Sequence, residues 1–399
     1  MLEQPISKAG WTRVAFGDVV RKVNDKVDPW DSGLERYVAG EHMDTDDMRI
    51  RRWGLIGDDY LGPAFHMRFK PGHVLYGSRR TYLRKVALAD FEGITANTTF
   101  VLETKDPDRL MPELLPFLMQ TEAFHSYSIK HSKGSVNPYI NFSDLEAFEF
   151  LLPPIQQQAR LVEALSASAT NLDCLFLLHE QAAVLLDALI LETIEIRGFS
   201  MTQGYKGRFQ VEKGERIYHA RSGNGEPTPD AAGDTLFFKV ADFNRNSDHR
   251  KLANAEVKFS AKSNPGIRVF QPGTVVFPKR GASIFLNKIG ILVHPAALDP
   301  NLMALEPRAE KVSAEYLMWF YKGIGLWRFA DTTSVPQLNH KHLNPVHVPV
   351  PSIEQQGEIC ARISLLADAL ANSADRLRKA QDAHTKIREG IFSETEVSA

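Results

Sequence analysis

The chain has 399 residues and an almost balanced charge, with 47 lysines and arginines against 49 aspartates and glutamates. This length is sufficient for two domains with separate cores, and the balance excludes a uniformly basic nucleic-acid binder but not local basic patches. The two cysteines, Cys174 and Cys360, lack metal-ligand spacing, which favours free thiols and no metal site. We find no apolar stretch of about 18 residues suited to a bilayer and no signal-peptide pattern, so we expect a cytoplasmic protein.

The first half, residues 1–153, is expected to form a mixed α/β domain. Alternating apolar residues predict strands, an apolar run predicts a helix, and a last strand ends at a proline pair. The second half, residues 201–351, shows the same order of elements. The predicted strands cover 14–20, 73–76, 98–102 and 147–152, with 275–277, 289–293 and 345–350 in corresponding places, and the predicted helices cover 112–124 and 313–329.

A long helix is predicted after each half, over 154–200 and 352–399. Apolar residues recur at alternating spacings of three and four, which is a heptad pattern, and each helix would be about 60 Å long. Because the chain must leave the first helix, fold a second domain and return, we expect the helices to pair antiparallel as a coiled coil. The principal residues of the expected seam are Leu165, Leu172, Phe176, Leu186, Ile363, Leu370, Leu377 and Ile387.

Two neighbouring registers of this helix pair fit the pattern. Phe176 lies opposite Ser373 in one and opposite Ala380 in the other, so that a large residue meets a small one. His179 and His384 also fall on the seam, where single histidines are interpreted as polar register markers or half-exposed residues and not as metal ligands. A second apolar stripe on the first helix predicts a further buried contact, either within the chain or with another protein.

The two halves also share sequence motifs, separated by roughly 200 residues, a period too long for a solenoid. Residues 69–79, with a Pro-Gly turn and a basic end, return as 270–280. Residues 134–141, Gly-Ser-Val-Asn-Pro-Tyr-Ile-Asn, and 152–158, Leu-Pro-Pro-Ile-Gln-Gln-Gln, return as 333–339 and 350–356. Residues 36–65 and 204–265 differ most. Two homologous domains that read different targets are indicated.

Basic residues interleaved with tyrosines and hydroxyl residues follow the strand at 73–76, where a loop can approach DNA phosphates. Arginine, asparagine and glutamine are also suited to reading base edges. A solvated basic loop would look similar, and Asn141 and Asn339 are better explained as helix caps. The candidate DNA-binding residues are Tyr76, Ser78, Arg79, Arg80, Tyr82, Arg84, Lys85, Lys130, Lys133, Ser135, Lys279, Arg280, Ser283, Asn287, Lys288, Thr333, Ser334, Gln337, His340 and Lys341.

Three other functions fit parts of the sequence less well. The sequence Asn-Pro-Tyr at 137–139 is close to an adenine methyltransferase motif but lacks a proline and a preceding glycine-rich loop. Asp230, Glu256 and Lys258 imitate a metal-dependent nuclease core, without a counterpart in the first half. A helical scaffold without DNA affinity is the third alternative.

The duplicated motifs resemble those of the DNA-specificity subunit of type I restriction-modification systems, over nearly the whole chain. Gln157 and Gln355 stand where that family more often has glutamate, and the second copy lacks the glycine before its serine. The resemblance implies two target recognition domains, each reading one half of a split DNA site, with the helices setting the spacing. It further implies a non-catalytic subunit that holds two adenine-N6 methyltransferase subunits and that a motor-nuclease subunit can join. S-adenosylmethionine, ATP and Mg²⁺ would then belong to the partners.

Overall fold

The computed structural model describes residues 7–58, 60–196, 207–246, 249–333 and 335–392, and the backbone of two short strands, β11 (Phe199–Ser200) and β12 (Gly204–Tyr205). The chain divides into two compact units. Unit 1 comprises Met1–Leu175 with Leu377–Ala399, and unit 2 comprises Phe176–Arg376. Each unit therefore combines one half of the sequence with part of both long helices, α5 (Ile155–Thr193) and α9 (Ile353–Phe392).

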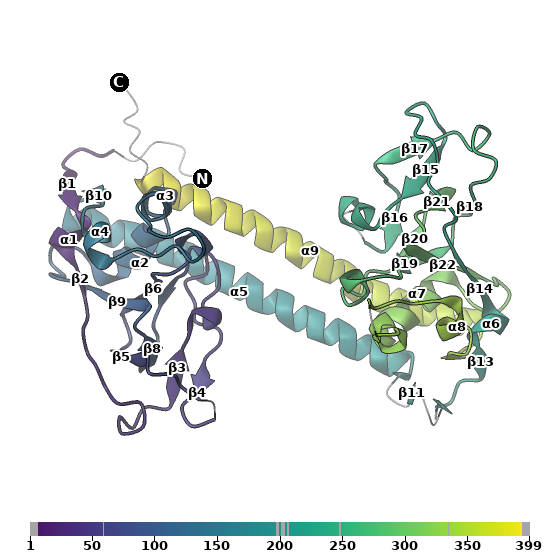
Figure 1. The fold of residues 1–399 in the computed structure, drawn as a ribbon, viewed down its shortest axis with the longest axis horizontal. Helices are drawn as coiled ribbons and strands as arrows, with labels where there is room; N and C mark the ends of the chain where they lie inside the picture. The colour runs from purple at the N-terminus through teal and green to yellow at the C-terminus, as the bar shows by residue number, and fades with distance from the viewer. Residues whose placement is uncertain are drawn as a thin grey trace. The chain divides into compact units, whose positions relative to one another are not determined.

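Unit 1 is mixed α/β with three sheets (Figure 1). An antiparallel pair joins β1 (Thr12–Ala15) to β10 (Glu149–Leu152). A second sheet has the order β2 (Val20–Lys22), β9 (Thr99–Thr104), β6 (Val74–Gly77), β7 (Val86–Leu88), and a third the order β4 (Gly54–Leu55), β3 (Arg36–Val38), β8 (Gly93–Ala96), β5 (Phe65–Phe69). The helical segments are α1 (Phe16–Val19), η1 (Gly40–His42), η2 (Thr81–Leu83), η3 (Pro112–Leu114), α2 (Leu115–Met119), α3 (Glu122–Lys130) and α4 (Phe142–Glu146).

Unit 2 repeats this topology with one additional edge strand in its largest sheet. β13 (Val211–Lys213) pairs with β23 (His347–Pro349). The larger sheets have the orders β14 (Tyr218–Ser222), β22 (Leu302–Pro307), β19 (Val275–Pro278), β20 (Gly290–Leu292), β16 (Lys251–Leu252), and β17 (Val257–Phe259), β15 (Thr235–Phe238), β21 (Ala296–Leu298), β18 (Val269–Phe270). The helical segments are α6 (Gly214–Ile217), η5 (Val240–Arg245), η6 (Ala282–Ile284), α7 (Ala314–Ile324), η7 (Leu326–Phe329) and α8 (His340–Leu343).

The predicted α/β class and the internal repeat are confirmed, and several element predictions are wrong in detail. The predicted helix over 313–329 is divided at Gly325 into α7 and η7, and the helix predicted over 154–200 ends at Thr193. Residues 14–20 are two strands separated by the helical turn α1, which the Asp18 carboxylate supports by accepting a hydrogen bond of 3.2 Å from Ala15 N–H. Residues 112–124 are divided among η3, α2 and the start of α3. The last division occurs because Thr121 caps α3, with its hydroxyl 3.2 Å from Phe124 N–H. The strand at 290–292 corresponds to β7 and not to β9, whose counterpart is β22.

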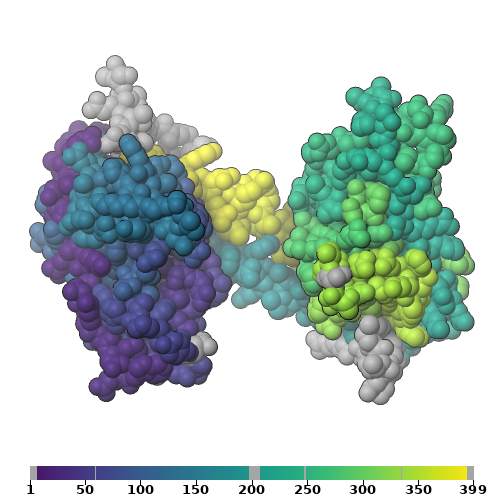
Figure 2. Space-filling model, in the orientation of Figure 1, coloured from purple at the N-terminus to yellow at the C-terminus, as the bar shows by residue number. Residues whose placement is uncertain are grey.

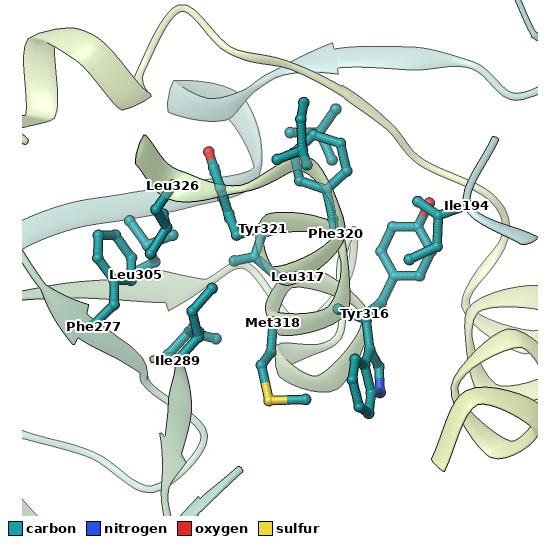
Figure 3. Close-up of a cluster of buried hydrophobic side chains, with 14 of the residues drawn as sticks. Ile194, Phe277, Ile289, Leu305, Tyr316, Leu317, Met318, Phe320, Tyr321 and Leu326 are labelled. Carbon is teal, nitrogen blue, oxygen red and sulfur yellow. The ribbon is translucent and has the colours of Figure 1, made fainter. Parts of the chain in front are cut away.

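Each unit has its own hydrophobic core, to which the long helices contribute. In unit 1, Leu161 and Leu165 of α5 and Ile391 of α9 are buried with Phe16 and Phe124. In unit 2 the core surrounds α7, where Tyr316, Leu317, Phe320 and Tyr321 pack together (Figure 3). The space-filling view shows the C-terminal part of α9, in yellow, against unit 1 (Figure 2). The helices are thus built into the domains.

The two histidines of the seam establish how α5 and α9 pair. In unit 1, His384 Nδ1 lies 3.0 Å from Ser168 Oγ, and in unit 2, His179 Nδ1 lies 2.9 Å from Ser373 Oγ. The numbering rises from 168 to 179 along α5 while it falls from 384 to 373 along α9, so the helices are antiparallel as predicted. The register lies between the two expected ones, because His179 and not Phe176 meets Ser373.

The proposed seam residues are shielded to different degrees. Leu165, Leu186 and Ile363 are buried, and the other five are partly buried: Leu172, Phe176, Leu370, Leu377 and Ile387. By length and composition alone α5 is apolar enough to cross a membrane, contrary to our expectation from the sequence. One such helix is weak evidence for a membrane span, because the core helix of a soluble protein passes the same test of length and composition.

Candidate nucleic-acid interface

The basic loop after the central strand lies against the Gly-Ser motif in the same way in both units. In unit 1, Arg80 N–H donates to Pro138 O at 2.5 Å and Ile140 N–H donates to Ser78 O at 3.0 Å. In unit 2, Gly281 N–H donates to Pro336 O and Leu338 N–H to Lys279 O, both at 2.8 Å. Two segments that are about 60 residues apart in sequence therefore form one surface in each unit.

The Gly-Ser motif is itself folded back by a two-residue backbone pair. Lys133 and Tyr139 exchange hydrogen bonds of 2.7 and 2.9 Å in unit 1. Asp331 and Gln337 exchange bonds of 2.9 and 3.0 Å at the equivalent place in unit 2. The described side chains between the paired residues are thus carried on a short closed loop next to the basic loop.

Many of the candidate DNA-binding side chains on this surface are solvent-exposed. The exposed candidates of unit 1 are Arg79, Arg80, Tyr82, Lys130, Lys133 and Ser135, and those of unit 2 are Arg280, Thr333, His340 and Lys341. Lys133 is paired with Asp144 at 2.9 Å, whereas neither Arg79 nor Arg80 forms a side-chain hydrogen bond or ion pair within the described part of the chain. Ser283 and Gln337 are partly buried, and Ser334 lies outside the described residues.

Two candidates cannot contact DNA because they are buried. Tyr76 is 1% exposed and its hydroxyl is hydrogen-bonded to Ser128 Oγ, and burial raises its pKa to about 12. Ser78 is 5% exposed and donates its hydroxyl to Thr98 O at 2.7 Å. Both residues lie on or next to β6, where alternate side chains face the core. The sequence prediction for Tyr76 and Ser78 is therefore wrong.

Other candidates hold the loop in place. Arg84 is ion-paired with Asp46 at 2.8 Å and with Glu122 at 2.7 Å. The Lys85 amine donates to Gly40 O, and burial, the largest cause, lowers its pKa. In unit 2, Asn287 Nδ2 donates to Lys322 O at 2.8 Å, Lys279 Nζ to Ser222 Oγ at 2.7 Å, Lys288 Nζ to Asn244 Oδ1 at 2.5 Å, and Ser283 Oγ to Arg280 O at 2.8 Å.

The divergent segments lie beside the basic loops, which the sequence did not reveal. Thr45 Oγ1 donates to Leu83 O at 2.9 Å, and Asp46 pairs with Arg84, so residues 40–46 border the loop of unit 1. Asn244, at the equivalent place in unit 2, contacts Lys288. Each unit therefore presents a shared basic loop next to a segment that differs between the two halves.

Several motif residues have structural roles. Asn141 and Asn339 are the N-cap residues of α4 and α8, as expected, although their backbone N–H groups are the ones bonded, to Asp144 and His342 side chains at 3.2 and 3.3 Å. Pro138 of the methyltransferase-like triplet has the same backbone role as Pro336, which lies in no such triplet.

The second glutamine of each Gln-Gln pair is buried and joins its long helix to the α/β domain. Gln158 Oε1 accepts from Met111 N–H, and its Nε2 donates to Arg109 O and Pro153 O, all at 2.9 Å. Gln356 makes the same three bonds, to Ser313 N–H at 2.8 Å, Lys311 O at 2.9 Å and Pro351 O at 3.0 Å. This duplicated bonding explains why the motif occurs twice.

The nuclease-like carboxylates are engaged by neighbouring groups. Asp230 Oδ1 accepts from Ala232 N–H at 3.0 Å, and Glu256 is ion-paired with Arg245. Among the residues that the structure describes, no group of three or more His, Cys, Asp or Glu side chains is placed to hold a metal ion.

The chain is similar in sequence and in fold to known proteins. Residues 10–173 match the family of the type I restriction modification DNA specificity domain. The specificity subunit of the type I restriction enzyme EcoDI from Escherichia coli is 25% identical over 174 residues, which is 43% of this chain. The match spans only 38% of the length of that relative.

Two solved structures share the fold over almost the whole chain. One comes from a study of complex assembly and conformational transition of the type I R-M system, with 19% identity, a TM-score of 0.55, and coverage of 98% of this chain and 100% of that one. The other is the S subunit of a type I restriction-modification system from M. genitalium, with 16% identity, a TM-score of 0.58 and coverage of 99% of both chains. The fold is thus that of type I S subunits. Residues 10–173 thus match the DNA specificity domain of type I restriction-modification systems, and the whole chain shares the fold of their S subunits.

Proposed function

We propose that this chain binds double-stranded DNA at a bipartite target, with each unit reading one half-site. The observation that carries the proposal is the duplicated surface in which the loop after β6 or β19 is bonded to the Gly-Ser motif. Exposed cations on that surface suit phosphate contacts, and the neighbouring amide and hydroxyl groups suit base edges. The adjoining divergent segments supply the difference between the two half-sites.

We propose two roles for these candidates. The proposed positioning residues, which hold the loops through bonds within each unit, are Arg84, Lys85, Lys279, Ser283, Asn287 and Lys288. The proposed contacting residues are Arg79, Arg80, Tyr82, Lys130, Lys133, Ser135, Arg280, Thr333, Gln337, His340 and Lys341.

In this function the chain is itself non-catalytic and cytoplasmic. The chemical reactions are carried out by partner subunits. Two adenine-N6 methyltransferase subunits would bind this chain, and a motor-nuclease subunit would join them. Leu177, Leu178, Val184 and Leu185 of α5 are 52–68% exposed, which leaves an apolar surface in unit 2 for such a partner. S-adenosylmethionine, ATP and Mg²⁺ would be bound by the partners.

Methylome sequencing tests the proposal. DNA from cells that express the chain with a cognate methyltransferase subunit is compared with DNA from cells that express the methyltransferase alone. We expect a new split motif with methylated adenine in both halves. No new methylation despite a stable complex would favour the scaffold alternative or a nuclease-associated DNA binder.

Single-residue variants test whether the proposed surface of each unit reads one half-site. Arg79→Ala is expected to weaken or alter methylation that depends on one half-sequence, and Arg280→Ala that of the other. The two residues are matched, because each forms the backbone bridge between basic loop and Gly-Ser motif in its unit. A methylation map that neither variant changes would contradict the assigned surface.

A further inference from the structure

Two arginines of the basic loop in unit 1 have a backbone conformation that side chains with a Cβ rarely adopt. Arg80 has φ 51° and ψ 56°, and Arg84 has φ 51° and ψ 44°, both in the left-handed region. In the second copy, Gly281, with φ 74° and ψ −166°, precedes η6 as Arg80 precedes η2, and Asn287, with φ 48°, lies further along the same loop. Glycine and asparagine tolerate positive φ, whereas arginine is strained there.

The strain at Arg84 is offset within the protein. Its guanidinium forms ion pairs with Asp46 and Glu122, and it is partly buried between them. Arg80 differs, because its side chain is exposed and makes no hydrogen bond or ion pair within the described residues. Backbone bonds to Pro138 and Leu83 hold Arg80 in place, but no side-chain contact among the described residues of unit 1 offsets the strain. Residues held in such conformations without internal compensation are concentrated at functional sites.

The surroundings of Arg80 are rich in positive charge. Lys85 lies close enough to interact electrostatically with both Arg80 and Arg52, which lower its pKa after burial, the largest cause. Asp44 is paired with Arg52 at 2.5 Å, and Asp44 and Glu41 act on Lys85 in the opposite direction to the cations. Among the described residues, Arg80 is therefore the cation of this group that has no carboxylate partner. An array of neighbouring cations is matched by the repeated charges of a nucleic-acid backbone and not by a single neutral base edge.

We propose that Arg80 binds a phosphate of the DNA backbone, and that unit 2 lacks this contact because Gly281 occupies the equivalent position. This inference rests on the proposed function and deepens it. The two units would then bind their half-sites with unequal electrostatic contributions. Arg80 would then strengthen DNA binding, although its strained backbone lowers the stability of unit 1.

The test uses the complex of the full chain with its methyltransferase subunits and a duplex containing the methylated target. Arg80→Gly should raise the Tm of the chain by about 2–4 °C, because the strain is relieved. It should weaken binding to DNA of any sequence by about five- to twentyfold and reduce the slope of log K against log salt by about one. Arg80→Asn, which also tolerates positive φ, should give the same loss of binding.

Two controls separate strain from charge. Arg84→Gly relieves similar strain but removes two ion pairs, so it should not raise the Tm. Arg160→Gln removes an exposed cation of unit 1 outside the surface and should leave the salt slope unchanged.

Three results would overturn the inference: unchanged DNA affinity and salt slope in Arg80→Gly, relaxed specificity at one base with an unchanged slope, or a lower Tm. Failure of the proposed function would look different, because the wild-type complex itself would then show no sequence-specific binding.

Discussion

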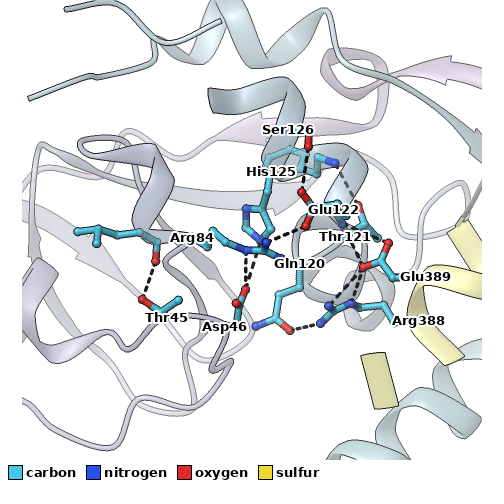
Figure 4. A network of polar contacts seen from close by, with 12 residues as sticks. Thr45, Asp46, Arg84, Gln120, Thr121, Glu122, His125, Ser126, Arg388 and Glu389 are labelled. Atoms are coloured by element: carbon cyan, nitrogen blue, oxygen red, sulfur yellow. Dashed lines mark hydrogen bonds and ion pairs between the residues drawn. The ribbon is translucent and has the colours of Figure 1, made fainter. Parts of the chain in front are cut away.

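Arg388, near the end of α9, donates a hydrogen bond of 3.0 Å to the side chain of Gln120, which precedes it by 268 residues (Figure 4). Arg388 is only 4% exposed. Its neighbour Glu389 accepts from the backbone N–H of Glu122 at 3.1 Å, and Glu122 is paired with Arg84 of the basic loop. The end of α9 is thereby connected to the proposed DNA-binding loop of unit 1.

Arg388→Ala is expected to lower the free energy of unfolding by about 2–4 kcal/mol, because it leaves a cavity and an unpaired, buried Gln120. Thermal unfolding followed by fluorescence measures this loss. Arg362→Ala, on an exposed position of the same helix, serves as the control and should change stability by less than about 0.5 kcal/mol. Equal effects of the two variants would show that the Arg388 contact contributes little.

Gln158→Glu is expected to destabilise unit 1 by about 1–3 kcal/mol, since a carboxylate cannot donate to Arg109 O and Pro153 O. Gln356→Glu should have a similar effect in unit 2, where the same bonds occur. Denaturant unfolding of both variants is compared with that of Gln156→Glu, which changes an exposed residue of the same turn. A loss confined to one of the two units would contradict the equivalence of the motifs.

Acidification should destabilise unit 1 through His384. Burial, with a smaller contribution from Arg388, lowers the pKa of His384 to about 4. Because the folded pKa lies below the unfolded value of 6.5, the neutral histidine contributes its full stability above pH 6.5 and loses it as pH falls towards 4. The loss is on the order of 3 kcal/mol. Buried His125, whose pKa is lowered to about 3 mainly by desolvation, acts in the same direction.

His384→Gln should therefore flatten the dependence of Tm on pH between 7 and 4, because glutamine can still bond Ser168 and does not titrate. His219→Gln, at an exposed position, should leave the dependence unchanged. An identical pH profile for wild type and His384→Gln would exclude His384 as a source of acid sensitivity.

Lengthening both helices tests the proposal that they set the DNA spacer. Seven residues inserted between Ser168 and His179 of α5, and seven between Ser373 and His384 of α9, keep the heptad pattern and both His–Ser pairs. Seven helical residues add about 10 Å, or about three base pairs. We expect methylome sequencing to show the original half-sequences with a longer spacer. Insertion of seven residues in α5 alone mismatches the pair and should abolish the complex. A functional complex with the original spacer would refute this role of the helices.

Much of the fold could be predicted from local sequence pattern. The repeat of the Pro-Gly turn at 71–72 and 272–273 located β6 and β19 to within a residue, because a turn followed by alternating apolar residues specifies a strand through neighbouring residues alone. The long helices were equally clear, because a heptad pattern persists over ten turns. Thr121 illustrates where this reasoning failed, since a single hydroxyl cap divides an otherwise continuous apolar run.

The sequence by itself determined the two homologous halves, the antiparallel long helices and the segments that carry the proposed DNA contacts, because these depend on periodicity and on repeated motifs. Only the tertiary structure decided which side chains of those segments are available. Tyr76 and Arg80 are four residues apart in the same motif, yet one is 1% exposed and the other extends into solvent. Burial, ion pairing and the helix register depend on residues distant in the chain, such as Asp46 for Arg84 and Ser373 for His179. A local pattern does not contain that information.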